Sequence, residues 1–121
     1  MTPFGAKLRQ LRRDRRITLK EMAMGLNVSS AYLSALEHGK RGVPTWNMVQ
    51  RIIAFFNVIW DEAEELQRLA EISDPRVTVE TAGLDPKATE FANILSKHIS
   101  DLDKNALEEL TTLLNKKIWA S

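Results

Sequence analysis

The sequence has no cysteine among its 121 residues. Disulfide bonds and thiolate metal sites are therefore excluded, and the composition fits the reducing environment of the cytoplasm. The sequence also has no apolar run approaching the roughly 18 residues of a membrane-spanning helix, and no signal peptide at its start. We therefore expect a cytoplasmic protein that does not enter a membrane.

Groups that carry catalysis or bind metal ions are also scarce. The two histidines, His38 and His98, have no carboxylate or nucleophile arranged near them in the sequence, and there is no glycine-rich phosphate loop. His98 lies on an apolar-flanked helical face, where a lone histidine is more often a core or interface residue than a metal ligand. We therefore expect a protein that is not an enzyme and has no cofactor or metal site.

Charge is distributed unevenly along the chain, although its net value is only +1. Residues 1–60 contain ten Lys/Arg and three Asp/Glu, a net charge of +7, whereas residues 61–121 contain seven and thirteen, a net charge of −6. Such asymmetry suggests that one half faces an anionic partner. The alternative is two solvated surfaces that differ by chance, but the basic residues crowd into one short region, which favours the partner.

Capping residues and apolar spacing predict five helices in the first part of the chain, at residues 3–15, 18–26, 29–38, 45–56 and 60–72. The second begins with a capping box formed by Thr18 and Glu21, and the third ends at Gly39. Asn27, between the second and third helices, suits the left-handed conformation of a tight turn. These helices define an expected domain at residues 1–73.

Residues 74–121 are expected to form a smaller region with two further helices. One follows Asp85 and the other begins at about Asp103, and residues 76–81 alternate as a short strand would. Each helix has an apolar stripe that so small a region would struggle to bury alone. We expect a dimer interface formed by Val77, Val79, Phe91, Leu95, Leu107, Leu110, Leu114 and Ile118. In it, Val77 and Val79 of one chain would pair with those of the other. The alternative is packing onto the fourth and fifth helices of the same chain.

Two short helices joined by a turn of about three residues predict a helix-turn-helix. Ala23 supplies the small residue where the helices cross, and apolar residues lie on their inner faces. The outer face of the third helix carries only small residues, including Ser30, Ala31 and Ala35. Short side chains let a helix enter the major groove, where serine hydroxyls and alanine methyls can contact base edges. Packing against another protein is the alternative explanation for this face.

The segment that carries these features, residues 4–58, reads FGAKLRQLRRDRRITLKEMAMGLNVSSAYLSALEHGKRGVPTWNMVQRIIAFFNV. It resembles the Xre (Cro/cI-type) helix-turn-helix repressors of bacteria and their phages. The resemblance implies an all-α protein with a five-helix, lambda-repressor-like DNA-binding domain, usually dimeric. It departs from the family at Leu19, where a phosphate-binding glutamine is often found, and at Asn27, where glycine is common.

The resemblance also implies roles for individual residues. Base-facing positions are Ser30, Ala31, Tyr32 and Ala35. Phosphate-facing positions are Ser29, Ser34, His38, Lys40 and Arg41, with Arg13 and Arg16 at the basic end of the first helix as further candidates. A buried ion pair of the family maps onto Arg12 and Glu37, so we expect Arg12 to be structural. None of the base-facing residues is Gln, Asn or Arg, so specificity is expected to rely more on methyl contacts and DNA shape.

The expected function is that of a dimeric transcriptional regulator, a repressor by the resemblance, bound to double-stranded operator DNA through residues 29–38. The alternative is an antitoxin-type regulator whose acidic half binds a toxin or another protein, and an antirepressor is a further candidate partner. Toxin-binding extensions are often disordered until bound. The capped, amphipathic helices expected in residues 85–119 favour a folded region instead.

Overall fold

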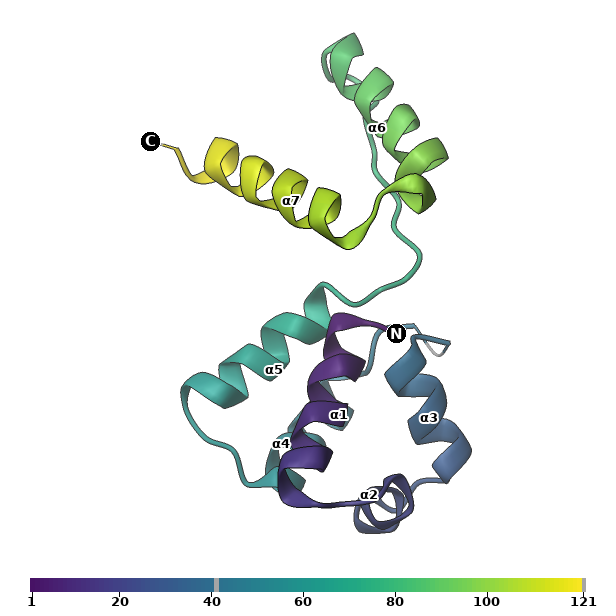
Figure 1. The fold of residues 1–121 in the computed structure, drawn as a ribbon, viewed down its shortest axis with the longest axis vertical. Helices are drawn as coiled ribbons and strands as arrows, with labels where there is room; N and C mark the ends of the chain where they lie inside the picture. Colours follow the sequence, from purple (N-terminus) through teal and green to yellow (C-terminus); the bar gives the residue numbers. More distant parts are fainter. Residues whose placement is uncertain (41, 121) are drawn as a thin grey trace. The chain divides into compact units, whose positions relative to one another are not determined.

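The computed structural model describes residues 1–40 and 42–120, and those residues form helices and loops without a strand. The chain divides into two compact units, Met1–Val77 and Thr78–Ser121 (Figure 1). The predicted all-α class is confirmed. The units meet four residues after the expected division at residue 73. Within the described ranges, no helix combines the length and the apolar character needed to cross a membrane.

The first unit contains five helices: α1 (Pro3–Arg15), α2 (Leu19–Leu26), α3 (Ser30–His38), α4 (Trp46–Phe56) and α5 (Asp61–Glu71). Local capping explains where they begin. Four of them start after a Ser or Thr whose side chain accepts a hydrogen bond from a backbone N–H in the first turn, which satisfies a donor that the helix itself cannot. Thr18 and Glu21 form the predicted capping box at α2.

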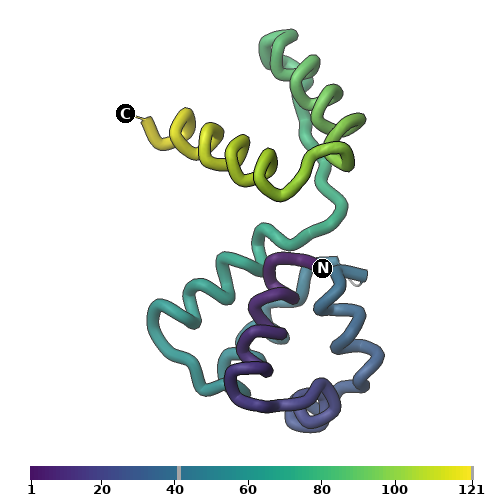
Figure 2. The backbone as a smooth tube through the Cα atoms, viewed as in Figure 1, coloured from purple at the N-terminus to yellow at the C-terminus, as the bar shows by residue number. Residues whose placement is uncertain are grey.

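Left-handed residues end the first four helices: Arg16, Asn27, Gly39 and Asn57. Asn27 has a φ of 57°, as the turn between α2 and α3 requires. α1 lies between α3 and α5 (Figure 2). One apolar core joins the helices, and its fully buried side chains come from every one of them: Phe4, Leu8, Met22, Leu33, Leu36, Ile52, Phe56 and Leu66.

Ser73 closes the first unit by joining its two ends. Its side-chain oxygen accepts a hydrogen bond of 2.9 Å from the backbone N–H of Phe4, at the start of α1. Its hydroxyl donates to the carbonyl of Leu69 in α5. Ser73 is only 2% exposed, so these two hydrogen bonds satisfy polar groups that water does not reach. The start of α1 and the end of α5 are therefore fixed to each other.

The second unit contains α6 (Pro86–His98), a 3₁₀ turn η1 (Ile99–Asp101) and α7 (Lys104–Trp119). Among its described residues, 78–120, none is buried. α6 and α7 diverge from the turn between them (Figure 1). The strand expected at residues 76–81 is wrong for the single chain, because an isolated extended segment has no second strand to bond with.

Candidate nucleic-acid interface

The turn between α2 and α3 is held by backbone hydrogen bonds to the last turn of α2. The N–H of Asn27 donates to the carbonyl of Met24 at 3.1 Å, and the N–H of Val28 donates to the carbonyl of Ala23 at 2.9 Å. Ala23 is 2% exposed, which agrees with the small residue that a close helix crossing requires. The side-chain oxygen of Ser29 then accepts from the N–H of Tyr32 at 3.0 Å and begins α3.

α3 has one buried face and one open face. Leu33 and Leu36 are buried at 0% and 2% exposure. On the open face, Ser30 and Ala31 are exposed and Ala35 is half-buried. The N-terminal part of α3 therefore presents short side chains that would not keep the helix backbone away from a surface in front of it.

The other residues expected to face DNA from α3 differ in how far they are buried. Ser29 is exposed at the cap, whereas Tyr32 and Ser34 are half-buried, and Tyr32 packs partly against the apolar core. Beyond the helix, Lys40 is exposed, and Arg41 lies outside the described residues. The structure thus brings the expected base-facing residues onto one short helix, although Tyr32 is less open than its neighbours.

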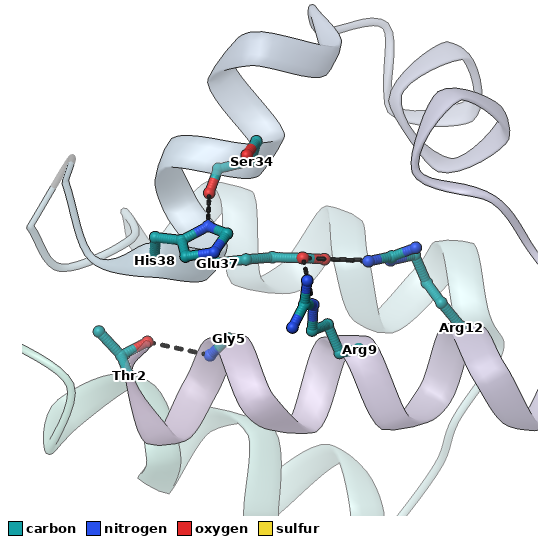
Figure 3. Close-up of polar contacts among 7 residues, drawn as sticks. All are labelled: Thr2, Gly5, Arg9, Arg12, Ser34, Glu37 and His38. Atoms are coloured by element: carbon teal, nitrogen blue, oxygen red, sulfur yellow. Dashed lines mark hydrogen bonds and ion pairs between the residues drawn. The ribbon is translucent and has the colours of Figure 1, made fainter.

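Glu37 fixes the C-terminal end of α3 against α1. Its carboxylate accepts two hydrogen bonds of 3.0 Å from Arg12, one from Nε and one from a terminal nitrogen (Figure 3). Nε of Arg9 lies 3.7 Å from the same carboxylate. Because Glu37 is 2% exposed and the Arg12 side chain 15%, this is a nearly dry ion pair with a fork-like geometry. The Arg12 side chain is thus engaged in a contact within the first unit.

The backbones of α1 and α3 approach closely at Gly5. A side-chain carbon added there would lie 1.8 Å from the carbonyl oxygen of Glu37, so only glycine fits. The same carbonyl accepts a bond of 3.4 Å from the N–H of Thr2, whose side chain caps α1 (Figure 3). Glu37 is therefore contacted by four residues in or directly before α1, and these contacts set where the end of α3 lies relative to α1.

The basic residues of the first unit fall into two groups. The first group is used within the fold: Lys7 lies 3.8 Å and 3.9 Å from carboxylates of α5, while Arg15 and Arg51 donate to the carbonyls of Phe56 and Leu26. The Arg15 guanidinium also lies over the Phe56 ring, 5.4 Å from its centre. Arg9 and Arg12 belong with this group because both contact Glu37.

The second group consists of exposed cations for which the described part of the chain provides no side-chain partner: Arg13, Arg16, Lys20, Lys40, Arg68 and Arg76. Arg13 and Arg16 lie at the end of α1, Lys20 lies in the first turn of α2, and Lys40 follows α3. These cations are free to bind an external anion. Lys20 was not among the residues expected from sequence, although its place beside Leu19 at the start of α2 was a usable signal.

His38 ends α3 with an exposed ring. Its Nδ1 lies 2.9 Å from the backbone carbonyl of Ser34, one turn earlier (Figure 3). With the proton on Nδ1, this contact is a hydrogen bond to the carbonyl, and Nε2 remains for a ligand outside the helix. No group of three or more metal-ligating side chains occurs among residues 1–40 and 42–120.

The residues expected at a dimer interface lie in the second unit or directly before it, and most are exposed. Phe91 is 62% exposed, and Leu107, Leu110, Leu114 and Ile118 are between 39% and 56% exposed. An apolar groove of about 370 Å³ runs between α6 and α7, and Leu95 also lines it. Val77 and Val79 are 77% and 61% exposed in the connecting segment.

Comparison with known proteins bears on the first unit. The family model described as a helix-turn-helix domain matches residues 3–69. An uncharacterized HTH-type transcriptional regulator of Bacillus subtilis (strain 168), RghRB, is 39% identical over 61 residues, which are 50% of this chain and 44% of that protein. The HTH-type transcriptional repressor RghR of the same organism is 48% identical over 44 residues, 36% of this chain and 33% of that protein.

The alignments therefore span less than half the length of either relative. No solved structure matches the chain. The family model covers more than half of the sequence, including all of α2 and α3 with the turn between them. This confirms the prediction made from the capping residues and the small-residue face: the chain belongs to the helix-turn-helix domain family.

Proposed function

We propose that the protein is a transcriptional regulator that binds double-stranded DNA sequence-specifically through the outer face of α3. The observation that carries the proposal is the asymmetry of α3. Leu33, Leu36 and Glu37 fix its inner face, while Ser30 and Ala31 lie open at its N-terminal end. The N-terminal residues of a recognition helix are those that meet base edges in the major groove. One relative is named an HTH-type transcriptional regulator and the other an HTH-type transcriptional repressor, which supports the same function.

In this proposal, base edges are contacted by Ser30, Ala31, Tyr32 and Ala35. Phosphates are contacted by the residues around α3, namely Ser29, Ser34, His38, Lys40 and Arg41, and by Arg13 and Arg16. Lys20 joins this set because it is exposed, unpaired among the described residues and located at the start of α2. Phosphate contacts position a protein on the duplex and make its affinity fall with salt, but they do not read sequence.

We also propose that the second unit makes the protein a homodimer. Eleven of its large apolar side chains are between 39% and 79% exposed. Together they expose an area on the order of 1,000 Å², comparable with the roughly 800 Å² that each partner contributes to a standard interface. Residues 78–120, the part of this unit that the structure describes, include no buried side chain and so form no core of their own, which a second copy would supply. Val77 and Val79, expected to pair across the dimer, are exposed in the segment that connects the two units, and we place the proposed interface in α6 and α7.

A dimer would bind two half-sites related by a two-fold axis and would repress by occluding a promoter. Repression is supported by the relative RghR, which is named a transcriptional repressor. Neither relative is named as an antitoxin. The proposed location is the cytoplasm, where the DNA is.

The test is selection of bound fragments from a random DNA library, followed by footprinting of the enriched fragments. An enriched two-fold sequence is expected, and Ala31→Glu is expected to abolish binding to it because charge and bulk enter the groove. Ala54→Glu is the matched control, since Ala54 is an exposed alanine of α4. Binding without enrichment, or an Ala31→Glu variant that binds like the control, would show that α3 does not read the DNA sequence.

A further inference from the structure

The segment between the two units is held at both ends. On the side of the first unit, Ser73 is buried, and Oδ1 of Asp74 accepts a bond of 2.9 Å from the N–H of Arg76. Between them, the Pro75 ring lies beside the end of α3: a carbon added at Gly39 would be 3.7 Å from it. The chain therefore leaves the first unit next to the C-terminal end of the proposed recognition helix.

On the side of the second unit, the chain is held from Thr81 onward. The hydroxyl of Thr89 in α6 lies 2.8 Å from the Thr81 hydroxyl, and the N–H of Leu84 donates to the Thr81 carbonyl at 3.1 Å. Asp85 then caps α6 through the N–H of Lys87 at 2.8 Å. Only residues 77–80 lie between the last contact on one side and the first on the other, and all four are exposed.

We propose that residues 77–80 are a tether whose length sets the spacing between the two half-sites bound by a dimer. This rests on the proposed dimeric, DNA-binding function. The five residue steps from Arg76 to Thr81 span at most about 17 Å when fully extended. The limit applies to each protomer and runs from Arg76, which follows the Pro75 ring beside the end of α3, so it acts on the distance between the two recognition helices.

The length of the tether determines which distances between half-sites a dimer can span. α6 and α7 are about 20 Å and 24 Å long, and we take the separation of the two Thr81 residues in the proposed dimer as one helix length, about 25 Å. Two fully extended tethers then allow the two Arg76 residues, each close to the end of an α3 helix, to lie at most about 60 Å apart. Half-sites one helical turn apart, about 35 Å, are within reach, whereas half-sites two turns apart, about 70 Å, are not.

The experiment uses the full chain and the DNA fragment enriched by selection, with base pairs inserted at its two-fold centre. The wild type should bind the original fragment and lose roughly 100-fold in affinity with ten added base pairs, because only one half-site is then engaged at a time. A variant with eight Gly/Ser residues inserted between Val79 and Glu80 should recover binding to the longer fragment, since each tether gains about 27 Å.

A control keeps the length of the tether and changes its side chains. The double variant Val77→Ser, Val79→Ser should show the same spacing preference as the wild type. A wild type that tolerates ten added base pairs within about three-fold, or an insertion variant as restricted as the wild type, overturns the tether. A changed preference in the serine variant would also overturn it, because specific valine contacts would then set the spacing.

Failure of the underlying function gives a different result. If the second unit does not dimerise, sedimentation shows a monomer at every concentration, and selection enriches a single half-site for which spacing has no meaning. If dimers form and a two-fold site is enriched, every outcome of the spacing series bears on the tether alone.

Discussion

Replacing Arg12 by alanine tests whether the ion pair with Glu37 supports the fold. The substitution removes two hydrogen bonds of 3.0 Å from a carboxylate that is 2% exposed, and leaves it with Arg9 at 3.7 Å. Breaking a buried pair in this way costs about 3–5 kcal/mol, because the remaining charge stays desolvated. Arg9 and the partial exposure of Arg12 place the expected loss near the lower limit, at about 3 kcal/mol.

Two neighbouring arginines provide the contrast. The Arg9 side chain is 49% exposed and makes one longer contact, so Arg9→Ala should cost only about 0.2–1 kcal/mol. Arg13 has no partner among the described residues, so Arg13→Ala should change stability by less than about 0.5 kcal/mol while lowering DNA affinity. The same substitution at three positions of one helix should therefore give three different results.

Urea unfolding followed by far-UV circular dichroism measures these differences. With a denaturant slope of about 1–3 kcal/mol per molar, the Arg12→Ala midpoint should fall by about 1–3 M, and the slope itself should not change. The reasoning is refuted if Arg12→Ala loses less than about 1 kcal/mol, or if Arg9→Ala is as destabilising, because the burial of the pair would then not determine its energetic weight.

Three further substitutions test other parts of the account. Lys40→Ala should weaken binding to all DNA sequences similarly and reduce the slope of log K against log salt by about 1, measured by fluorescence anisotropy; an unchanged slope would remove Lys40 from the phosphate contacts. Gly5→Ala should destabilise the first unit by about 1–3 kcal/mol, because the added carbon meets the Glu37 carbonyl; stability equal to the wild type in a urea titration would contradict that contact. Leu110→Asp should shift sedimentation towards monomer and weaken operator binding with it, and an unaltered dimer would exclude the groove between α6 and α7 as its interface.

Features with local causes could be predicted from the sequence. The capping box at Thr18 and the left-handed turn at Asn27 depend on residues within one helical turn, and the structure shows both. The burial of Leu33 and Leu36 follows from their spacing in the same way. The five helices of the first unit and the helix-turn-helix family were therefore accessible without coordinates.

Features that depend on tertiary contacts could not be predicted from the sequence. Arg12 and Arg13 are adjacent in the sequence, yet one is bound to Glu37 and the other is free, and only the packing of α3 on α1 decides which. The contact of Arg9 with Glu37 was missed, although its spacing of three residues from Arg12 places both on one face of α1. The strand at residues 76–81 was predicted from alternation alone, which identifies an extended preference but cannot supply a second strand.

The most direct test of the account uses the absence of cysteine, since a single thiol can be placed on the outer face of α3. Ala31→Cys should react with a maleimide at least ten times more slowly when the protein is saturated with its selected DNA, while Ala54→Cys on α4 should react at an unchanged rate. If Cys at position 31 reacts equally fast with and without bound DNA, α3 does not enter the groove, and the central claim is wrong.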